Sequence, residues 1–293
     1  NLVDSVVDMG LYATIAVDGA NNPHIAYHDN TDYDLKYARY NGVSWTTSTV
    51  DSAGTVGLNP AIALDGAGLA RIAYKKSAPN NLLYAKKSAD GSWNTFNVQG
   101  GITLNTNISL VLDSTGARIS YFDNDNNDLK HAKGDNNTWS TTVIDAEGDM
   151  GRFSHIAMDG NGNDYISYAY YNPGDTKYYL KIASFTGTVW STGTVDVMGN
   201  TGSEIYTSLA IDGSGDVHVS YPEIASNNLK MAHWSAGLAK PMGGNARGKA
   251  QAPTMFRNTG IGVSSATWEW NDNASNESGF RLYGGNYSSG PFT

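Results

Sequence analysis

The chain has 293 residues, a formal net charge of −9 and no cysteine. Disulfides and thiolate chemistry are therefore excluded, and such an acidic chain lacks the basic face that binding to a nucleic-acid backbone requires. Charged residues make up 16 % of the chain, and glycine and tyrosine are frequent, at 33 and 18 residues, which suits a turn-rich β-protein. No apolar run approaches the about 20 residues of a membrane-spanning helix, so we expect no membrane span. Asn1 begins no signal peptide, so we expect an exported chain to be already processed.

A repeat runs through residues 1–237; four signals mark each of its first four units, and the fifth unit has the first three of them. An aspartate closes a short apolar run, a tyrosine closes the next run, an LKYA-like string follows, and a tryptophan opens the last segment. The aspartates are Asp18, Asp65, Asp113, Asp159 and Asp212; the tyrosines are Tyr27, Tyr74, Tyr121, Tyr168 and Tyr221; the tryptophans are Trp45, Trp93, Trp139 and Trp190. The tyrosines are 47, 47, 47 and 53 residues apart, a period typical of stacked repeats.

Each repeat unit contains four short segments separated by turns rich in Gly, Asn and Asp. In the first unit they are ATIAVD, PHIAY, LKYARY and WTTSTV. Their length, alternation and β-branched content predict antiparallel strands, and no window shows the 3.6-residue apolar period of a helix. Four antiparallel strands in a repeat of this length are typical of a propeller blade, so we expect an all-β fold.

The two ends of the repeat array complement each other. The fifth unit, from about Ser203, has no tryptophan-led fourth segment, whereas the N-terminal residues align with the end of one: Val3-Asp4 corresponds to Val50-Asp51, and Gly10 to Gly57. We therefore predict a five-bladed β-propeller in which the N-terminal strand completes the last blade. This closure covers an edge that would otherwise be open to aggregation.

Residues 1–237 resemble five-bladed β-propellers of exported bacterial repeat proteins, through the pattern IAxDGxGxxHIAYxD…LKYA…W. The resemblance implies a secreted or cell-surface protein, but propellers host lectins, glycosidases and scaffolds alike. The turn SADGSW, ending at Trp93, resembles the Asp-box of sialidase-like propellers. The other units match it poorly, so we interpret the tryptophans as wedges between blades.

A linker at residues 238–252 precedes a tail, residues 253–293, that resembles the first half of a bacterial fibronectin type III domain. The matching residues are Trp268, Trp270, Asp272, Asn273, Asn276, Glu277, Gly279, Phe280 and Tyr283. A complete sandwich of this type needs roughly 100 residues. We therefore expect this partial β-sandwich either to continue in a longer chain or to pair with a neighbouring subunit in self-assembly.

The loops that join fourth to first strands and second to third strands share one face of such a propeller. Five residues six positions before the repeat aspartates gather there: Tyr12, Asn59, Asn107, Phe153 and Tyr206. The second-to-third loops add Asp29, Tyr170, Tyr171 and Glu223. Aromatic platforms with amides and carboxylates around a cleft suit sugars, so we predict an extracellular binding or adhesion module for a glycan or a cell-surface protein.

Two other functions stay open, a structural subunit of an extracellular assembly and a glycoside hydrolase. Hydrolysis needs a pair of carboxyl groups, and the candidates are Asp29, Asp123 and Glu223. However, propeller glycosidases place their acids at the start of the innermost strands, where this chain has none. A calcium loop is a further candidate at Asp123, Asp125 and Asp128, although such Asx-rich strings are also common in hairpin turns. No other cofactor is expected.

Overall fold

A computed structural model describes residues 2–5, 8–105, 107–200, 205–224, 226–234, 254–261 and 266–271. The chain falls into two compact units, residues 1–243 and 244–293. Every regular element within the described residues is a β-strand, as the sequence predicts. The same residues contain no helix long and apolar enough to cross a membrane.

The first compact unit contains five antiparallel sheets, and within each the strands follow one another in chain order. Sheet 1 contains β1 (Met9–Val17), β2 (Pro23–Asp29), β3 (Asp34–Tyr40) and β4 (Trp45–Asp51). Sheet 2 contains β5 (Thr55–Leu64), β6 (Ala70–Ser77), β7 (Asn81–Lys87) and β8 (Trp93–Gly100). Sheet 3 contains β9 (Ser109–Asp113), β10 (Gly116–Asp123), β11 (Asp128–Asp135) and β12 (Thr138–Asp145). Sheet 4 contains β13 (Asp149–Met158), β14 (Asp164–Asn172), β15 (Lys177–Phe185) and β16 (Trp190–Asn200). Sheet 5 contains β17 (Ser208–Ile211), β18 (Val217–Glu223) and β19 (Asn228–Trp234).

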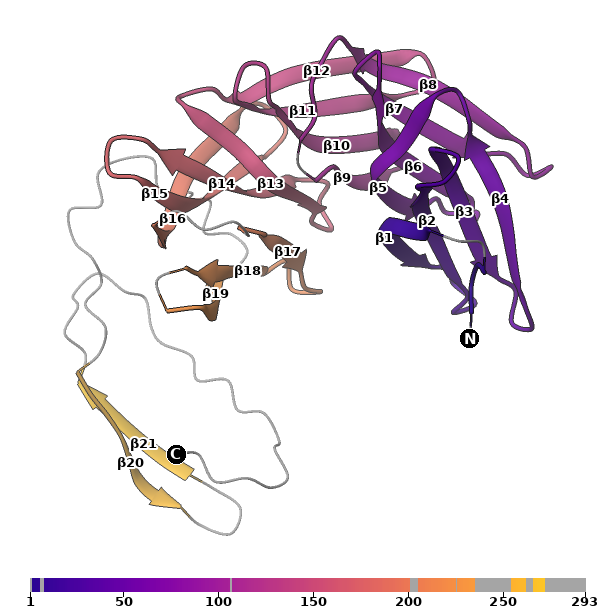
Figure 1. The fold of residues 1–293 in the computed structure, drawn as a ribbon. Coiled ribbons are helices and arrows are strands. Elements are labelled where there is room, and N and C mark those ends of the chain that lie inside the picture. The colour runs from indigo at the N-terminus through magenta and orange to yellow at the C-terminus, as the bar shows by residue number, and fades with distance from the viewer. Residues whose placement is uncertain are drawn as a thin grey trace. The chain divides into compact units, whose positions relative to one another are not determined.

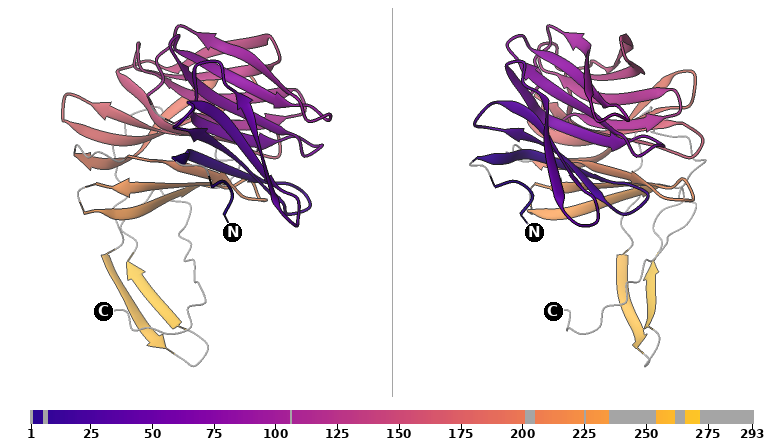
Figure 2. Two further views of the ribbon diagram at one scale, coloured as in Figure 1. Left: turned by 45° about the vertical axis from the view of Figure 1, so that its right-hand side comes forward. Right: turned by 90° about the vertical axis from the view of Figure 1, so that its right-hand side faces the viewer.

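The five sheets follow one another in an arc, as Figures 1 and 2 show, and the first strands of successive sheets contact one another from β1 to β17. Apolar clusters fill the spaces between successive sheets. Between sheets 1 and 2, for example, Leu35 and Tyr37 pack with Ile62, Ile72 and Tyr74. The core is therefore divided among the sheet-to-sheet interfaces, as in a β-propeller.

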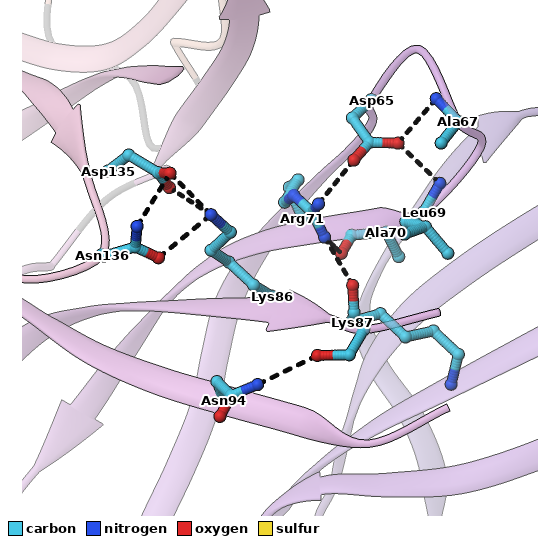
Figure 3. Close-up of polar contacts among 11 residues, drawn as sticks. Asp65, Ala67, Leu69, Ala70, Arg71, Lys86, Lys87, Asn94, Asp135 and Asn136 are labelled. Atoms are coloured by element: carbon cyan, nitrogen blue, oxygen red, sulfur yellow. Dashed lines mark hydrogen bonds and ion pairs between the residues drawn. The ribbon is translucent and has the colours of Figure 1, made fainter. Parts of the chain in front are cut away.

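The repeat aspartates hold the turn between the first two strands of each sheet. Asp65 illustrates the arrangement in Figure 3: its Oδ1 accepts the backbone N–H groups of Ala67, at 3.0 Å, and Leu69, at 2.9 Å. Its Oδ2 pairs with the guanidinium of Arg71. Equivalent backbone hydrogen bonds recur at Asp18, Asp113, Asp159 and Asp212. The repeat aspartates therefore stabilise the turns, because their carboxylates accept backbone N–H groups that have no partner in the strand pairing.

The repeat tyrosines join each sheet to the one before it. Tyr74 Oη in β6 donates to Asp51 Oδ2 at the end of β4, at 2.7 Å, and Tyr168 Oη in β14 donates to Asp145 Oδ2 at the end of β12, at 2.6 Å. Tyr27 Oη makes the same bond to Asp4 Oδ2 at 2.7 Å. The N-terminal residues thus occupy, against sheet 1, the place that the end of a preceding fourth strand occupies elsewhere.

The tryptophans that open the fourth strands pack between sheets. Trp93 lies edge-on to Tyr37 of the preceding sheet, with ring centroids 5.1 Å apart, and Trp139 lies edge-on to Tyr84 at the same distance. Trp190 contacts His131 with ring centroids also 5.1 Å apart, the two rings being tilted by 59°. This agrees with the interpretation of these residues as wedges.

The blade count and the closure by the N-terminal strand stay predictions. Sheet 5 has three strands within the described residues, and residues 2–5 form no strand. No contact between β17 and β1 matches those between the other successive first strands, among residues that the structure describes.

The second compact unit contributes one described feature. β20 (Thr254–Ile261) and β21 (Ala266–Asn271) form an antiparallel pair, and β21 carries Trp268 and Trp270, which the fibronectin resemblance places in a strand. The predicted linker at 238–252 and the remaining tail residues from Asp272 to Tyr283 lie outside the described residues.

Candidate functional site

The first strand of sheets 1, 2 and 4 bends at two successive irregularities in its pairing. Each bend begins at a glycine with positive φ. Two residues later a non-glycine residue also has a positive φ: Tyr12 (55°), Asn59 (48°) and Phe153 (54°). Non-glycine residues seldom adopt this conformation, and such outliers are concentrated at functional sites. The sequence places these three residues at one repeat position, and the structure gives them the same unusual backbone.

A pocket of about 420 Å³ opens between the first strands of sheets 1 to 4. Its lining includes Tyr12, Asn59 and Asn107, three of the residues that the sequence predicts for ligand binding. The first-strand residues Pro60, Ile62 and Leu110 add apolar wall. The pocket therefore combines an exposed aromatic ring, two amides and apolar surface in one concavity.

His155 also lines this pocket, and the sequence analysis did not single it out. Its Nδ1 accepts the backbone N–H of Leu209 at 2.8 Å, which leaves the proton of the neutral ring on Nε2. Burial lowers the pKa of His155, and Nδ1 can accept the Leu209 N–H only while the ring is neutral. The imidazole is therefore a neutral hydrogen-bonding group at physiological pH.

Two further predicted residues, Phe153 and Tyr206, contact each other. Phe153 and Tyr206 lie edge to face, with ring centroids 4.7 Å apart, and join sheet 4 to sheet 5. Tyr206 is 52 % exposed. Neither residue is part of the pocket lining, so the structure brings three of the five predicted first-strand residues into the pocket and pairs the other two beside each other.

The three candidate acids lie at the ends of second strands, each in a different sheet. Asp29 is fully buried, and its Oδ1 accepts the N–H groups of Thr31 and Asp32 at 2.9 and 3.1 Å. Asp123 Oδ1 likewise accepts the N–H groups of Asp125 and Asn126, at 3.1 and 3.3 Å. Its Oδ2 accepts from the Asn126 amide and the Lys130 ammonium, both at 2.9 Å. These carboxylates cap their own turns.

Glu223 and Asp123 both have lowered pKa values, whereas a general acid needs a raised pKa. A hydrogen bond from Ser226 lowers the pKa of Glu223. Burial pushes the pKa of Asp123 upward, but the hydrogen bonds from Asn126 and Lys130 outweigh it, so the pKa is lowered overall. Both groups are therefore ionised at neutral pH.

Tyr170 and Tyr171 lie at the end of β14, outside the pocket lining. Tyr170 contacts Tyr179 with ring centroids 5.9 Å apart, and Tyr171 contacts Tyr178 at 5.0 Å. The Lys181 ammonium lies 5.5 Å from the centroid of Tyr170. Successive side chains of a strand point to opposite faces of the sheet, so the two tyrosine pairs lie on opposite faces of sheet 4.

The calcium candidates do not converge. Asp125 Oδ2 accepts the N–H of Thr103 at 2.8 Å, whereas Asp123 binds its own turn and Lys130. Burial raises the pKa of Asp128. In the part of the chain that the structure describes, no three His, Asp or Glu side chains gather as metal ligands. The contacts of Asp123 and Asp125 are those of turn residues.

A second concavity, of about 1030 Å³, lies between sheets 3 and 4, near the tryptophans that open their fourth strands, Trp139 and Trp190. Its lining includes Arg118, His131, Asp164 and Trp190. Arg118 binds Asp164 at 2.6 Å and also pairs with Asp113. Burial raises the pKa of Asp113, but hydrogen bonds from Thr115 and Arg118 bring it to about 2. Arg118 is therefore neutralised by two carboxylates, and its charge is not available to an anionic ligand.

No family model matches the chain, and no curated protein matches it. Several solved structures match the chain. The SapL1 lectin, in complex with α-methyl fucoside, matches with a TM-score of 0.55 and 16 % identity over 90 % of both chains. The GH93 α-L-arabinofuranosidase of Fusarium graminearum has a TM-score of 0.54 and 13 % identity over 80 % of this chain and 84 % of its own. The fucose-specific lectin of Aleuria aurantia has a TM-score of 0.50 and 16 % identity over 80 % of this chain and 77 % of its own.

At these identities the likeness concerns the fold. The chain has an all-β fold of repeated four-stranded antiparallel sheets, in agreement with the β-propeller fold of these lectins and arabinofuranosidases.

Proposed function

We propose that the protein is a carbohydrate-binding module whose ligand enters the pocket between the first strands. The observation that carries this proposal is the pocket itself, in which Tyr12, Asn59 and Asn107 meet. An aromatic ring offers a face to the C–H surface of a sugar, and planar amides donate to and accept from its hydroxyl groups. Two of the similar structures are sugar-binding lectins, which supports a sugar as the ligand.

Binding explains the pocket better than hydrolysis does. Among the residues that the structure describes, no acidic side chain contributes to the lining of the pocket. Asp29 and Asp123 cap turns, Glu223 accepts a hydrogen bond from Ser226, and these three acids lie in separate sheets. A glycosidase instead needs two carboxyl groups about 5–10 Å apart across the scissile bond. The arabinofuranosidase with a similar fold keeps hydrolysis as the alternative to be measured.

A glycan array with the full chain tests the proposal. We expect the wild type to bind a defined set of glycans and Tyr12→Ala to weaken that binding at least tenfold, about 1.4 kcal/mol. The matched control is Tyr40→Ala, which removes an aromatic ring at the opposite end of sheet 1, where Tyr40 packs on Trp45. Release of reducing sugar by the wild type would instead establish a hydrolase, and no binding at all would favour the structural subunit.

We also propose that five sheets are the full set of blades and that the N-terminal segment supplies the fourth strand of sheet 5. The Tyr27–Asp4 hydrogen bond supports this, because in sheets 2 and 4 the same tyrosine binds the last residue of the preceding fourth strand. Deletion of residues 1–5 should lower the melting temperature, and an unchanged value would contradict the proposal.

The location of the protein outside the cell, its adhesive role and self-assembly through residues 253–293 are proposals that rest on the sequence resemblances. Limited proteolysis combined with size-exclusion chromatography tests the assembly: an oligomer that separates into monomers when the tail is removed supports it. A monomer that is indifferent to the loss contradicts it.

A further inference from the structure

The backbone of β9 directs one N–H group toward the pocket between the first strands. β9 is an edge strand of sheet 3, and the turn at residues 114–115 places Asp113 and Gly116 in a hydrogen-bonded pair. Hydrogen-bonded and non-hydrogen-bonded pairs alternate along an antiparallel ladder, so Leu110, opposite Ile119, lies in a non-hydrogen-bonded pair. Its N–H therefore points out of sheet 3, on the side of the pocket that Leu110 lines.

In two other sheets a side chain of the preceding sheet accepts the equivalent N–H group. Ile156 N–H donates to Ser109 Oγ at 3.1 Å, and Leu209 N–H donates to His155 Nδ1 at 2.8 Å. Both acceptors lie two residues after the predicted ligand-binding position of the first strand. The residues at this acceptor position are Thr14, Ala61, Ser109, His155 and Ser208.

Leu110 N–H lacks this acceptor, because the residue at the acceptor position is Ala61. The Ala61 methyl group packs with Ile108 and Leu110 in the apolar cluster between sheets 2 and 3. Among the residues that the structure describes, no other acceptor binds Leu110 N–H. Leu110 is only 8 % exposed, and a buried N–H without a partner is costly. A ligand atom that accepts this N–H is therefore stabilised at the wall of the pocket.

The rest of the pocket offers further donors and apolar surface but no charge. His155 carries its proton on Nε2, and Asn59 and Asn107 add amide groups. Pro60 and Ile62 add apolar wall beside Ala61. Within the described residues, the lining contains no lysine, arginine, aspartate or glutamate. The pocket therefore suits an uncharged acceptor that has an apolar group next to it.

Two acceptor groups are common on sugars besides the hydroxyl, a carboxylate and the carbonyl of an acetamido group. A carboxylate would lose its water here without gaining a cation, in a chain whose net charge is −9. An acetamido carbonyl is neutral, so its burial requires only a donor. Its methyl group also fits an apolar wall.

We propose that the pocket recognises the acetamido group of an N-acetylated sugar. The acetamido oxygen accepts Leu110 N–H, and the acetamido methyl packs against Ala61 and Ile62. Asn59 and Asn107 then remain for the hydroxyl groups of the sugar ring. This inference rests on the proposed function and adds the class of sugar to it.

The substitution Ala61→Ser tests the proposal, because it puts a hydroxyl at the position from which Ser109 accepts Ile156 N–H. The new hydroxyl should accept Leu110 N–H and so compete with the ligand. The matched control is Ala63→Ser, which adds the same hydroxyl to the same strand outside the pocket lining.

The probes for the full chain are the methyl glycosides of N-acetylglucosamine and N-acetylgalactosamine, with methyl glucoside, methyl galactoside and methyl glucuronide for comparison. Isothermal titration gives their affinities, and the glycan array is repeated with each variant. We expect the wild type and Ala63→Ser to bind an acetamido sugar at least tenfold more tightly than its 2-hydroxy parent. Ala61→Ser should lose this preference and keep its affinity for the parent sugar. Thermal unfolding checks that both variants are folded.

Hydrogen exchange measured by NMR reports on the N–H group without any sugar. In the free wild type the Leu110 amide should exchange faster than the amides of Ile156 and Leu209, which have acceptors. Ala61→Ser should slow the Leu110 amide, and Ala63→Ser should not. Equal protection of the three amides in the free wild type would show that Leu110 N–H is already bonded and would overturn the proposal.

The binding results separate this inference from the proposed function. If acetamido sugars and their parents bind equally, carbohydrate binding stands and the acetamido proposal is wrong. Preference for the glucuronide would show a carboxylate site instead, and an acetamido preference that survives Ala61→Ser would place that group elsewhere. If neither a glycoside nor an array glycan binds, the proposed function fails and this inference fails with it.

Discussion

The hydrogen bond between Tyr168 and Asp145 offers a direct measure of how strongly neighbouring sheets are joined. Tyr168 is fully buried, and burial raises its pKa well above the ordinary value, so the hydroxyl stays protonated and donates to Asp145 Oδ2 at 2.6 Å. Lys181 Nζ binds the same oxygen at 2.5 Å. The substitution Tyr168→Phe removes the hydroxyl and leaves the ion pair and the ring in place.

The chain contains its own matched control. Tyr121 has the same repeat position and is also fully buried, but its hydroxyl donates to the neutral amide Gln99 Oε1, at 2.5 Å. Hydrogen bonds to charged groups contribute about 1.5–3 kcal/mol, and those between neutral groups about 0.5–1.5 kcal/mol. Tyr168→Phe should therefore lower the free energy of unfolding by about 2 kcal/mol and Tyr121→Phe by about 1 kcal/mol.

Urea unfolding followed by circular dichroism measures both losses, and calorimetry should show a fall in Tm of about 2–4 °C for each kcal/mol. Equal losses, or a larger loss for Tyr121→Phe, would refute the reasoning that the charge on the acceptor sets the strength of this contact. A third variant, Asp145→Ala, leaves both Tyr168 and Lys181 without their partner and should cost more, about 3–5 kcal/mol.

Three further outcomes are expected. Gly57→Ala and Gly151→Ala should each unfold at lower urea, because alanine is strained at their positive φ and its Cβ would also meet leucine backbone at 2.7 and 2.6 Å. Gly10→Ala has the backbone strain but no such contact in the open arrangement, so a midpoint as low as the other two supports the ring closure and a smaller loss contradicts it. Burial, helped by Arg118 and Lys133, lowers the pKa of His131 to about 4, so the unfolded state binds the proton more tightly and stability falls as pH drops from about 6.5 towards 4. In His131→Tyr, which restores the residue type of Tyr37 and Tyr84, acid titration should show a smaller loss in that window, and an unchanged loss would contradict this assignment. Asp123→Asn should lower the free energy of unfolding by about 1–2 kcal/mol, because its turn loses hydrogen bonds, and should leave glycan affinity unchanged. A variant that keeps its stability but loses glycan affinity, or loses a sugar-releasing activity of the wild type, would show that Asp123 acts in the site.

The sheets and their turns were predictable because the repeat makes local signals occur together. A turn aspartate such as Asp65 binds N–H groups within four residues, so its role is written in the nearby sequence. The Tyr74–Asp51 bond was not predictable in the same way, since it joins residues of neighbouring sheets whose lateral packing the repeat does not specify. Each tyrosine was expected only to close a strand.

The candidate site was predictable in part for a similar reason. Tyr12, Asn59 and Asn107 share one repeat position, and identical positions on neighbouring first strands meet around one pocket. His155 lies two residues further than Phe153, at a position occupied by small side chains in other sheets, and only that change of residue type could have indicated it. Asp29 was predicted as a ligand-binding or catalytic residue, but its burial depends on how its turn folds over it, which composition does not reveal.

Hydrogen–deuterium exchange of the full chain, with and without the glycan that binds best on the array, tests the central claim most directly. If the sugar occupies the pocket between the first strands, amide protection should increase at residues 11–15, 58–62, 107–110 and 153–156, which form or flank its lining. Protection confined to residues 115–142 and 185–190, around the concavity between sheets 3 and 4, would place the ligand elsewhere and contradict the account.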